Sequence, residues 1–429
     1  MTEISETQSR VAARLARRHA GEKRFKLLSL GAVWVGLVFL GVLLFTVIGS
    51  GHTAFLQTKI LLNVTLEETD LGEAGEGGQA QAIAGANYNG VIKRTLRAVF
   101  PEARSRSDKR ALYRLVSVGA AYEIREAMME HENPVGTPVA VWVTASDDVD
   151  LIIKGTVPRT APADQRHLSD QQMNWIESLE KTEAVKARFN TTFFTSGDSR
   201  EPELAGVLGG AMGSLYAILV CLAISFPLGV MSAVYLECFA PKNRLTEFIE
   251  VNINNLAAVP SIVFGLLGLA IFLNAFMLPR SAPLVGGMVL SLLTLPTIII
   301  AGRAAIKSVP PSVREAALAL GASPVQAVFH HVLPLAMPGI LTGTIIGTAG
   351  ALGETAPLLM IGMVAFIVDV PTSVVDPSTV LPVQIFLWSD IPEKAFVERT
   401  SAAILVLLSF VCLLNLFAVY LRKRFETRW

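Results

Sequence analysis

The chain has 429 residues, of which 52% are hydrophobic and only 17% are charged. Charged residues make up about a quarter of an ordinary soluble protein, so this composition indicates a membrane protein and excludes a disordered chain. The 36 basic and 36 acidic residues cancel, and a neutral chain lacks the basic surface with which proteins bind nucleic acid.

Six apolar runs are long enough to cross a bilayer, which takes about 20 residues of helix. The runs lie at 27–49, 207–235, 256–278, 283–301, 335–368 and 401–421. Basic residues precede the first run, but its apolar core is longer than that of a signal peptide, so we interpret it as an uncleaved anchor. We therefore predict an all-α polytopic membrane protein with six transmembrane helices.

Lysine and arginine residues in the short flanks of these runs predict the orientation. The basic residues of 1–26, the loops that contain Lys242 and Arg303, and the tail 422–429 all fall on the same side. The positive-inside rule assigns that side to the cytoplasm, so we expect both termini to be cytoplasmic.

Residues 50–205 lie between the first and second runs and are numerous enough for a domain with its own core. The orientation places this domain outside the cytoplasm. We expect a mixed α/β fold, with a hairpin around Asp147 and Asp148. Its predicted elements are helical patterns at 108–129 and 169–189 and strands at 139–143 and 151–153.

Several kinds of site are not expected in this chain. No segment matches the phosphate-binding loop Gly-x-x-x-x-Gly-Lys-Ser/Thr, and we interpret the glycine- and glutamate-rich segment 72–78 as a flexible connector. The three cysteines and six histidines show no metal-binding spacing. We predict no metal site and no hydrolysis of nucleotide by such a loop in this chain.

The strongest local pattern lies between the fourth and fifth runs. Ser312 and Glu315 predict a capping box at the start of a short helix, and Gly321 is suited to end it in a left-handed conformation. Ser323 and Gln326 then predict the start of a second helix. The first helix is unusually apolar for a loop, so it either docks into a partner's groove or packs on its own bundle.

Residues of this loop, 308–334, match a known pattern: Glu315, Ala316, Ala317, Gly321, Leu333 and Pro334. They resemble the EAA loop of ABC importer permeases, which docks as a coupling helix on the ATPase subunit. His331 stands where that family usually has an aliphatic residue. This departure concerns the packing at one position and leaves the spacing of the motif intact.

Segments 255–263, 353–359 and 381–386 extend the resemblance. Together with the loop they are similar to the PstA family, the permease subunits of phosphate-specific importers, from about residue 204 onward. The residues before that point resemble an N-terminal extension found on some members. The implied fold is a type I ABC importer permease with an inserted extracytoplasmic α/β domain.

The resemblance also implies partners and a location. The partners are a second homologous permease subunit, an ATPase dimer that uses the ATP, an extracytoplasmic phosphate-binding protein and the lipid bilayer of a bacterial inner membrane. The expected segments are a cytoplasmic N-terminus (1–26), a first transmembrane helix (27–49), an extracytoplasmic α/β domain (50–205), a permease domain with five transmembrane helices (206–421) and a cytoplasmic tail (422–429).

Glu354 is the ionisable residue in the middle of the fifth run. An uncompensated charge there costs several kcal/mol, so a function is expected. Because a carboxylate repels phosphate, we interpret Glu354 as a partner for a cation or as a gate element, with a protonated, structural glutamate as the alternative. Family members commonly have an arginine four residues earlier, where this chain has Gly350, so the cation must come from another helix.

Two further residues belong to the predicted pathway. Thr355 follows Glu354, and Arg303 lies at the cytoplasmic end of the fourth run, where phosphate would leave. For Arg303, a topology-setting role is favoured over contact with phosphate.

We therefore expect a transport subunit, not an enzyme, that forms half of the pathway of an ATP-driven phosphate importer. A permease for another oxyanion, such as sulfate or molybdate, is the nearest alternative, because the EAA loop alone does not distinguish them. A second alternative is a membrane sensor or regulatory subunit, since an anchor followed by a domain of this size is a common receptor layout.

Overall fold

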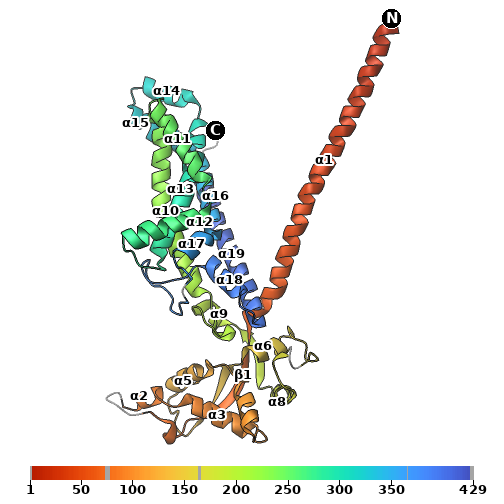
Figure 1. The fold of residues 1–429 in the computed structure, drawn as a ribbon, viewed down its shortest axis with the longest axis vertical. Helices are drawn as coiled ribbons and strands as arrows, with labels where there is room; N and C mark the ends of the chain where they lie inside the picture. Colours follow the sequence, from red (N-terminus) through yellow and green to blue (C-terminus); the bar gives the residue numbers. More distant parts are fainter. Residues whose placement is uncertain (1, 73–77, 163–165, 365, 426–429) are drawn as a thin grey trace. The chain divides into compact units, whose positions relative to one another are not determined.

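The computed structural model describes residues 2–72, 78–162, 166–364 and 366–425. The chain divides into two units, Met1–Ser50 and Gly51–Trp429, which are described separately. The first unit is formed by the helix α1 (Thr2–Gly51), drawn in red in Figure 1. The apolar stretch of this helix lies within a candidate membrane span, Gly21–Phe55, none of whose most apolar window is buried. The first predicted crossing, 27–49, lies inside that span.

The described part of the chain contains five helices long and apolar enough to cross a membrane, and a bent pair makes a sixth span if it counts as one. In the second unit the spanning helices are α10 (Leu208–Val234), α13 (Pro283–Lys307), α16 (Leu333–Gly353) and α19 (Lys394–Phe425). The bent pair is α11 (Arg244–Ala257) and the segment Ser261–Ala275, which consists of α12 (Ser261–Gly268) and the π-helical η5 (Leu269–Ala275). The prediction of a mainly helical membrane protein with about six spans is confirmed.

Two predicted crossings have the wrong bounds. The run 256–278 is not one straight helix, because α11 and α12 meet at an angle of 100° next to Pro260, which has no N–H to donate. The run 335–368 is helical only as far as Gly353, after which the short helix α17 (Ala356–Met360) follows. Pro357 explains this break, since its ring would collide with the carbonyl of Gly353 in a continuous helix.

The spanning helices pack closely where glycines face neighbouring helices. A Cβ added at Gly343 of α16 would lie 2.1 Å from the Cβ of Ala301 on α13, and one at Gly287 of α13 would lie 2.6 Å from the carbonyl oxygen of Ala217 on α10. Such contacts let helix backbones approach within a membrane, where packing and not hydrophobicity drives association. α10, α13 and α16 therefore form a compact group.

The segment between α1 and α10, residues 52–207, is called the insert domain below. Its antiparallel sheet has the strand order β2-β1-β3, with β1 (Leu56–Thr65) between β2 (Pro138–Thr144) and β3 (Val185–Phe189). Its helices are α2 (Gly78–Ala84), α3 (Tyr88–Val99), α4 (Arg106–Tyr113), α5 (Ala120–Glu130), α6 (Asp147–Ile153), α8 (Asp170–Lys181) and α9 (Thr191–Thr195). The prediction of an inserted α/β domain is confirmed.

The predicted hairpin in this domain is wrong. Residues 147–153 form the helix α6, which has three aspartates in its first turn. Negative charges at a helix N-terminus stabilise the helix through its dipole. The partner of β2 is β1, with Val143 opposite Ile60, far earlier in the chain. The helical pattern at 108–129 is split into α4 and α5, and the pattern at 169–189 ends in β3. The predicted connector 72–78 lies mostly outside the described residues.

The insert domain has a core of its own, built on the buried even-numbered residues of β1, Ile60, Leu62 and Val64. A second apolar cluster is shared with the membrane part, residues 208–425. In this cluster Phe193 of α9 packs with Trp388 and Phe396, and all three are at most 2% exposed. The insert domain therefore continues into the membrane part through a common core.

Candidate functional site

The loop between α13 and α16 folds as helix, glycine turn and helix, as the sequence predicts. Its helices are α14 (Pro311–Ala319) and α15 (Pro324–Ala327). Gly321 has φ +91°, and its N–H donates to the carbonyl oxygen of Leu318 at 3.0 Å. A residue with a Cβ is strained at this φ, so glycine is required for the chain to turn between the two helices.

One of the two predicted capping boxes is present. The N–H of Gln326 donates to Ser323 Oγ at 3.2 Å, and the N–H of Ser323 donates to Gln326 Oε1 at 2.9 Å. The box predicted between Ser312 and Glu315 is wrong, because α14 begins at Pro311 and Ser312 lies inside it. Proline suits the first helical position, since the N–H it lacks would have no partner there.

The loop runs into α16 without a break. Between α15 and α16 the chain forms a π-helical turn, η6 (Val328–Val332), and Leu333 and Pro334 follow in the first turn of α16. An α-helical turn would press the ring of Pro334 against the carbonyl of His330, and the wider π turn avoids this collision. A displacement of the loop would therefore act directly on α16.

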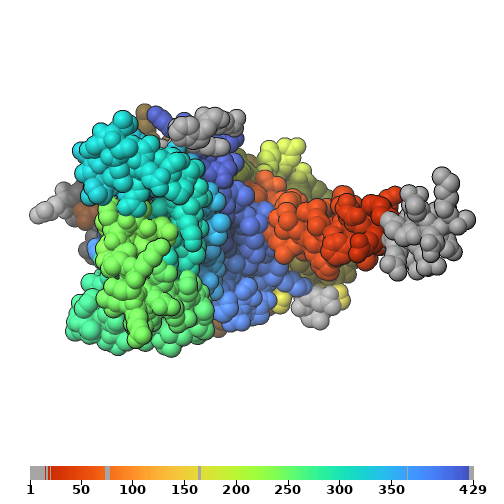
Figure 2. Space-filling model, turned by 90° about the horizontal axis from the view of Figure 1, so that it is seen from above, coloured from red at the N-terminus to blue at the C-terminus, as the bar shows by residue number. Residues whose placement is uncertain are grey.

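Several apolar side chains of this loop are exposed. Leu320 is 90% exposed and Val325 is 55% exposed, whereas Ala317 is 6% exposed. Glu315, Ala316, Gly321 and Pro334 are also exposed, and Leu333 is half-buried. Figure 2 looks onto this end of the membrane part and shows the turquoise α14 and α15 uncovered by the rest of the chain.

Two arginines connect the loop region to neighbouring helices. Arg314 of α14 donates to the carbonyl oxygen of Cys238 at 3.3 Å, in the π-helical segment η4 (Tyr235–Phe239) that ends α10. Arg303 of α13 lies between two carboxylates, with Nη2 2.7 Å from Glu250 Oε1 and Nε 3.5 Å from Glu237 Oε2. The structure thus places Arg303 at the loop end of the membrane part, in ion pairs.

Glu354 lies at the other end of α16 from the loop. It caps the C-terminus of α16 in an extended conformation, and Thr355 follows at the start of α17. Because a helix rises 1.5 Å per residue, the length of α16 separates Glu354 from Leu333 by about 30 Å. The structure does not bring Glu354 and Arg303 together, but it joins Glu354 to the loop through a single helix.

The Glu354 carboxylate is half-buried and forms no ion pair with any residue that the structure describes. The position of Gly350, one turn earlier on α16, is open: a Cβ there would meet no atom within 4 Å. A larger side chain would therefore fit beside Glu354. The roles predicted for Glu354, Thr355 and Arg303 remain predictions.

Sequence reasoning missed a group of buried polar residues at the junction of the insert domain with α18 (Leu381–Ser389) and α19. Asp198 accepts a hydrogen bond from Trp388 Nε1 at 2.8 Å, and burial raises the pKa of its carboxyl. Burial also raises the pKa of Glu203, to about 7, although a hydrogen bond from Ser117 opposes the shift. The signal that could have revealed the junction is the charged pair Glu398-Arg399 at the head of the apolar run 401–421.

The chain is similar to known membrane proteins. The family described as "Binding-protein-dependent transport system inner membrane component" matches residues 225–428, and a "Domain of unknown function (DUF3333)" matches residues 12–163. The second match covers most of α1 and of the insert domain through α6.

Two curated relatives and one solved structure illustrate the similarity. The chain is 35% identical to the probable ABC transporter permease protein YqgI of Bacillus subtilis (strain 168), over 39% of this chain and 56% of that protein, just over half its length. It is 34% identical to the phosphate transport system permease protein PstA 1 of Mycobacterium tuberculosis (strain CDC 1551 / Oshkosh), over 51% of this chain and 74% of that protein. The inward-facing MetNI methionine ABC transporter is 19% identical, over 50% of this chain and 92% of that chain, with a TM-score of 0.38.

Proposed function

This chain belongs to the PstA family of phosphate transport permeases, and from that premise we propose that it is the permease subunit of an ATP-driven phosphate importer. It forms half of the translocation pathway in a bacterial inner membrane, with both termini in the cytoplasm and the insert domain on the outer side. It binds no cofactor itself, because a separate ATPase subunit uses the ATP.

The observation that supports this function best is the exposed apolar surface of the loop. Leu320, which directly follows α14, is 90% exposed, and Leu318 within α14 is 38% exposed. An apolar helix at the end of a membrane bundle is stable in water when a partner's groove covers it. We assign that groove to the ATPase subunit, so Glu315, Ala316, Ala317, Gly321, Leu333 and Pro334 form the coupling loop.

The same reasoning gives Glu354 a role in the pathway. Its carboxylate has no cationic partner among the described residues of this chain, and Gly350 leaves open space beside it. A second, homologous permease subunit would supply the missing cation across the pathway. α16 then links the ATPase, which acts on the coupling loop, to the residue that changes partners as the pathway opens.

Uptake of labelled phosphate tests this function. Cells that lack the gene are compared with cells in which it is restored, with sulfate and molybdate measured in parallel. We expect a loss of high-affinity phosphate uptake that the restored gene repairs. Loss of sulfate or molybdate uptake instead would retain the permease and overturn phosphate as substrate, and unchanged uptake of all three would overturn the transport function.

A further inference from the structure

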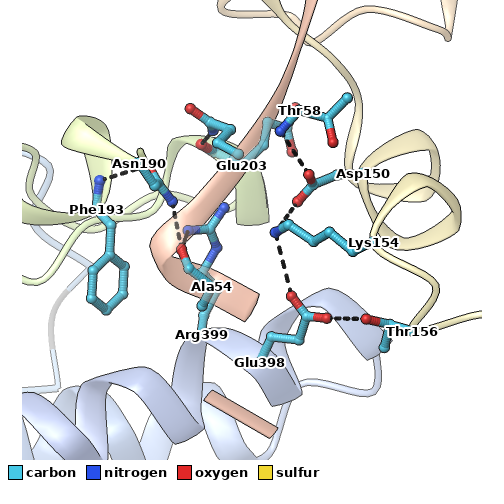
Figure 3. A network of polar contacts seen from close by, with 11 residues as sticks. Ala54, Thr58, Asp150, Lys154, Thr156, Asn190, Phe193, Glu203, Glu398 and Arg399 are labelled. Atoms are coloured by element: carbon cyan, nitrogen blue, oxygen red, sulfur yellow. Dashed lines mark hydrogen bonds and ion pairs between the residues drawn. The ribbon is translucent and has the colours of Figure 1, made fainter. Parts of the chain in front are cut away.

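A buried ion pair joins the insert domain to the last spanning helix. Lys154, at the end of α6, lies between Asp150 of the same helix and Glu398 of α19, with Nζ 3.5 Å from Glu398 Oε2. The three side chains are only 4%, 7% and 7% exposed. Figure 3 shows Lys154 pointing from the insert domain toward the first turns of α19, where Thr156 Oγ1 also donates to Glu398.

Further hydrogen bonds attach this pair to the backbone around the start of β1. Asp150 Oδ1 accepts from the N–H of Thr58 at 2.8 Å. Arg399, which is 3% exposed, donates to the carbonyl oxygen of Ala54 at 3.2 Å, and Asn190 Nδ2 donates to the same oxygen at 3.0 Å. These bonds form two neighbouring groups, one through Lys154 and one around the Ala54 carbonyl in η1 (His52–Phe55), and the adjacent residues Glu398 and Arg399 of α19 take part in one group each (Figure 3).

Buried charges make such a junction sensitive to its geometry. A charge removed from water is stable only while its partners stay within hydrogen-bonding distance, because a separated partner would be left buried and unpaired. The apolar cluster of Phe193, Trp388 and Phe396 adjoins the network, because Ala54 belongs to it and Arg399 lies over the ring of Phe193, 5.8 Å from its centroid. A hinge between α6 and α19 at this point would separate Lys154 from Glu398, at a large cost in free energy.

Beyond this junction, α19 is covered only in part by the rest of the chain. Only 11% of its most apolar window is buried, and an apolar groove of about 540 Å³ lies between α10, α16 and α19. At the far end of α19, Arg422 Nη1 lies 3.5 Å from Thr342 Oγ1 of α16. The insert domain thus contacts the N-terminal end of α19, and the C-terminal end of α19 contacts α16.

We infer that Asp150, Lys154 and Glu398 form a rigid joint through which the insert domain and the start of α19 move as one body. The insert domain then sets the orientation of α19, and α19 in turn biases α16, the helix that links the coupling loop to Glu354. The insert domain therefore stays attached to α19 in every state of the permease, and any movement of the domain also moves α19. The effect on transport rests on the proposed function, whereas the rigidity of the joint does not.

Distance measurements between spin labels test the joint directly. Labels are placed on cysteines at Tyr122, 72% exposed on α5, and Leu408, 38% exposed on α19, after the three native cysteines are replaced by alanine. The full chain is measured in its membrane complex, with and without ATP. We expect one narrow distance distribution that is the same in both states.

The substitution Lys154→Met removes the cation and leaves two carboxylates facing each other. We expect it to broaden the distance distribution and to lower phosphate uptake at least tenfold, whereas Lys154→Arg keeps both near the wild type. Lys154→Met with Glu398→Gln should narrow the distribution again, because fewer buried charges are unpaired. The matched control is Arg159→Met, which breaks the exposed pair with Glu180 and should change neither measurement.

Two results would overturn the joint. One is a wild-type distance that changes when ATP is added, and the other is an unchanged distribution in a folded Lys154→Met protein. If the Lys154→Met protein does not fold, the wild-type distances measured with and without ATP still test whether the joint is rigid. A wild type that transports no phosphate but has the constant, narrow distance would contradict the proposed function alone.

Discussion

Arg303 Nη2 lies 2.7 Å from Glu250 Oε1, and this contact joins the end of α13 to α11. Arg303 Nε lies 3.5 Å from Glu237 in η4 and forms no hydrogen bond of its own. The arginine is therefore shared by two carboxylates, close to the carbonyl of Cys238 to which Arg314 of the coupling loop donates. This arrangement suits a residue that positions the loop against the bundle.

The ion pairs of Arg303 predict the effect of its removal. Arg303→Met leaves the carboxylates of Glu237 and Glu250 facing each other in a partly buried site, and we expect a loss of about 1–3 kcal/mol in unfolding free energy. Thermal and denaturant unfolding of the purified chain in detergent measures this loss. Adding Glu250→Gln to Arg303→Met should restore part of the stability, since it removes one of the like charges.

That double variant also separates two roles for Arg303. If the residue positions the loop, phosphate uptake should recover together with stability. If it contacts phosphate in the pathway, uptake should stay low in a protein of normal stability. A single Arg303→Met variant as stable as the wild type would show that the ion pairs contribute nothing.

The turn at Gly321 is tested by a pair of substitutions. A Cβ at Gly321 would meet no atom within 4 Å, so only its φ of +91° restricts the residue. The left-handed conformation costs a valine residue about 1–2 kcal/mol, whereas asparagine adopts it more readily. We expect Gly321→Val to leave ATP hydrolysis in the assembled complex but to lower phosphate uptake at least tenfold, and Gly321→Asn to retain both.

Uptake and ATP hydrolysis are measured on the same reconstituted complex for both variants. Equal loss in the asparagine and valine proteins would show that the backbone conformation of Gly321 is not the cause. Full coupling in Gly321→Val would contradict the coupling role of the turn.

The exposed Leu320 predicts a contact with the ATPase subunit. Burial of a leucine side chain contributes about 1.5–3 kcal/mol, and about 1.4 kcal/mol corresponds to a factor of ten in affinity. We therefore expect Leu320→Glu to weaken binding of the ATPase subunit at least tenfold in a titration of detergent-solubilised protein. Val118→Glu, at a position 64% exposed in the insert domain, is the matched control and should bind normally.

Glu354 and Gly350 give a test of the pathway. Glu354→Gln should lower phosphate uptake at least tenfold without changing the amount of assembled complex, because the amide fills the same space but cannot pair with a cation. Gly350→Arg places a cation one helical turn from Glu354, within the range of an i,i+4 pair, and should also slow transport by competing for the carboxylate. Wild-type uptake in Glu354→Gln would support a neutral, structural glutamate.

The buried carboxyl of Glu203 predicts a pH dependence of stability. Its pKa is raised from 4.5 to about 7 in the folded protein, mainly by burial. As the pH rises above 4.5 the unfolded chain releases this proton first, so the folded state loses stability up to about pH 7. Glutamine has no proton to lose, so Glu203→Gln should gain up to about 3 kcal/mol at pH 7.5 and nothing at pH 4.5.

Unfolding of the full-length protein in detergent at these two pH values measures the gain. Ser117→Ala is a useful companion, because it removes the hydrogen bond that opposes the pKa shift and should extend the loss of stability to a higher pH. A gain for Glu203→Gln that is equal at both pH values would contradict the titration of this group.

Local patterns predicted the features that depend on neighbouring residues in the chain. The helical membrane runs follow from composition over about 20 residues, and the turn at Gly321 and the capping box at Ser323 follow from the conformations that single residues prefer. The motif in residues 308–334 could be recognised for the same reason, since all its residues lie within one loop. The aspartates of 147–150 misled the prediction, because a short apolar run beside them suits a strand and a helix equally.

The amino-acid sequence by itself thus determined the membrane class, the approximate number of spans and the helix-turn-helix form of the loop 308–334. Only the tertiary structure decided that Arg303 pairs with Glu237 and Glu250, that Glu354 stands about 30 Å from the loop along α16, and that Lys154 meets Glu398. These contacts join residues far apart in the chain, and the free energy of a buried charge depends on which partners the fold brings within a few ångströms.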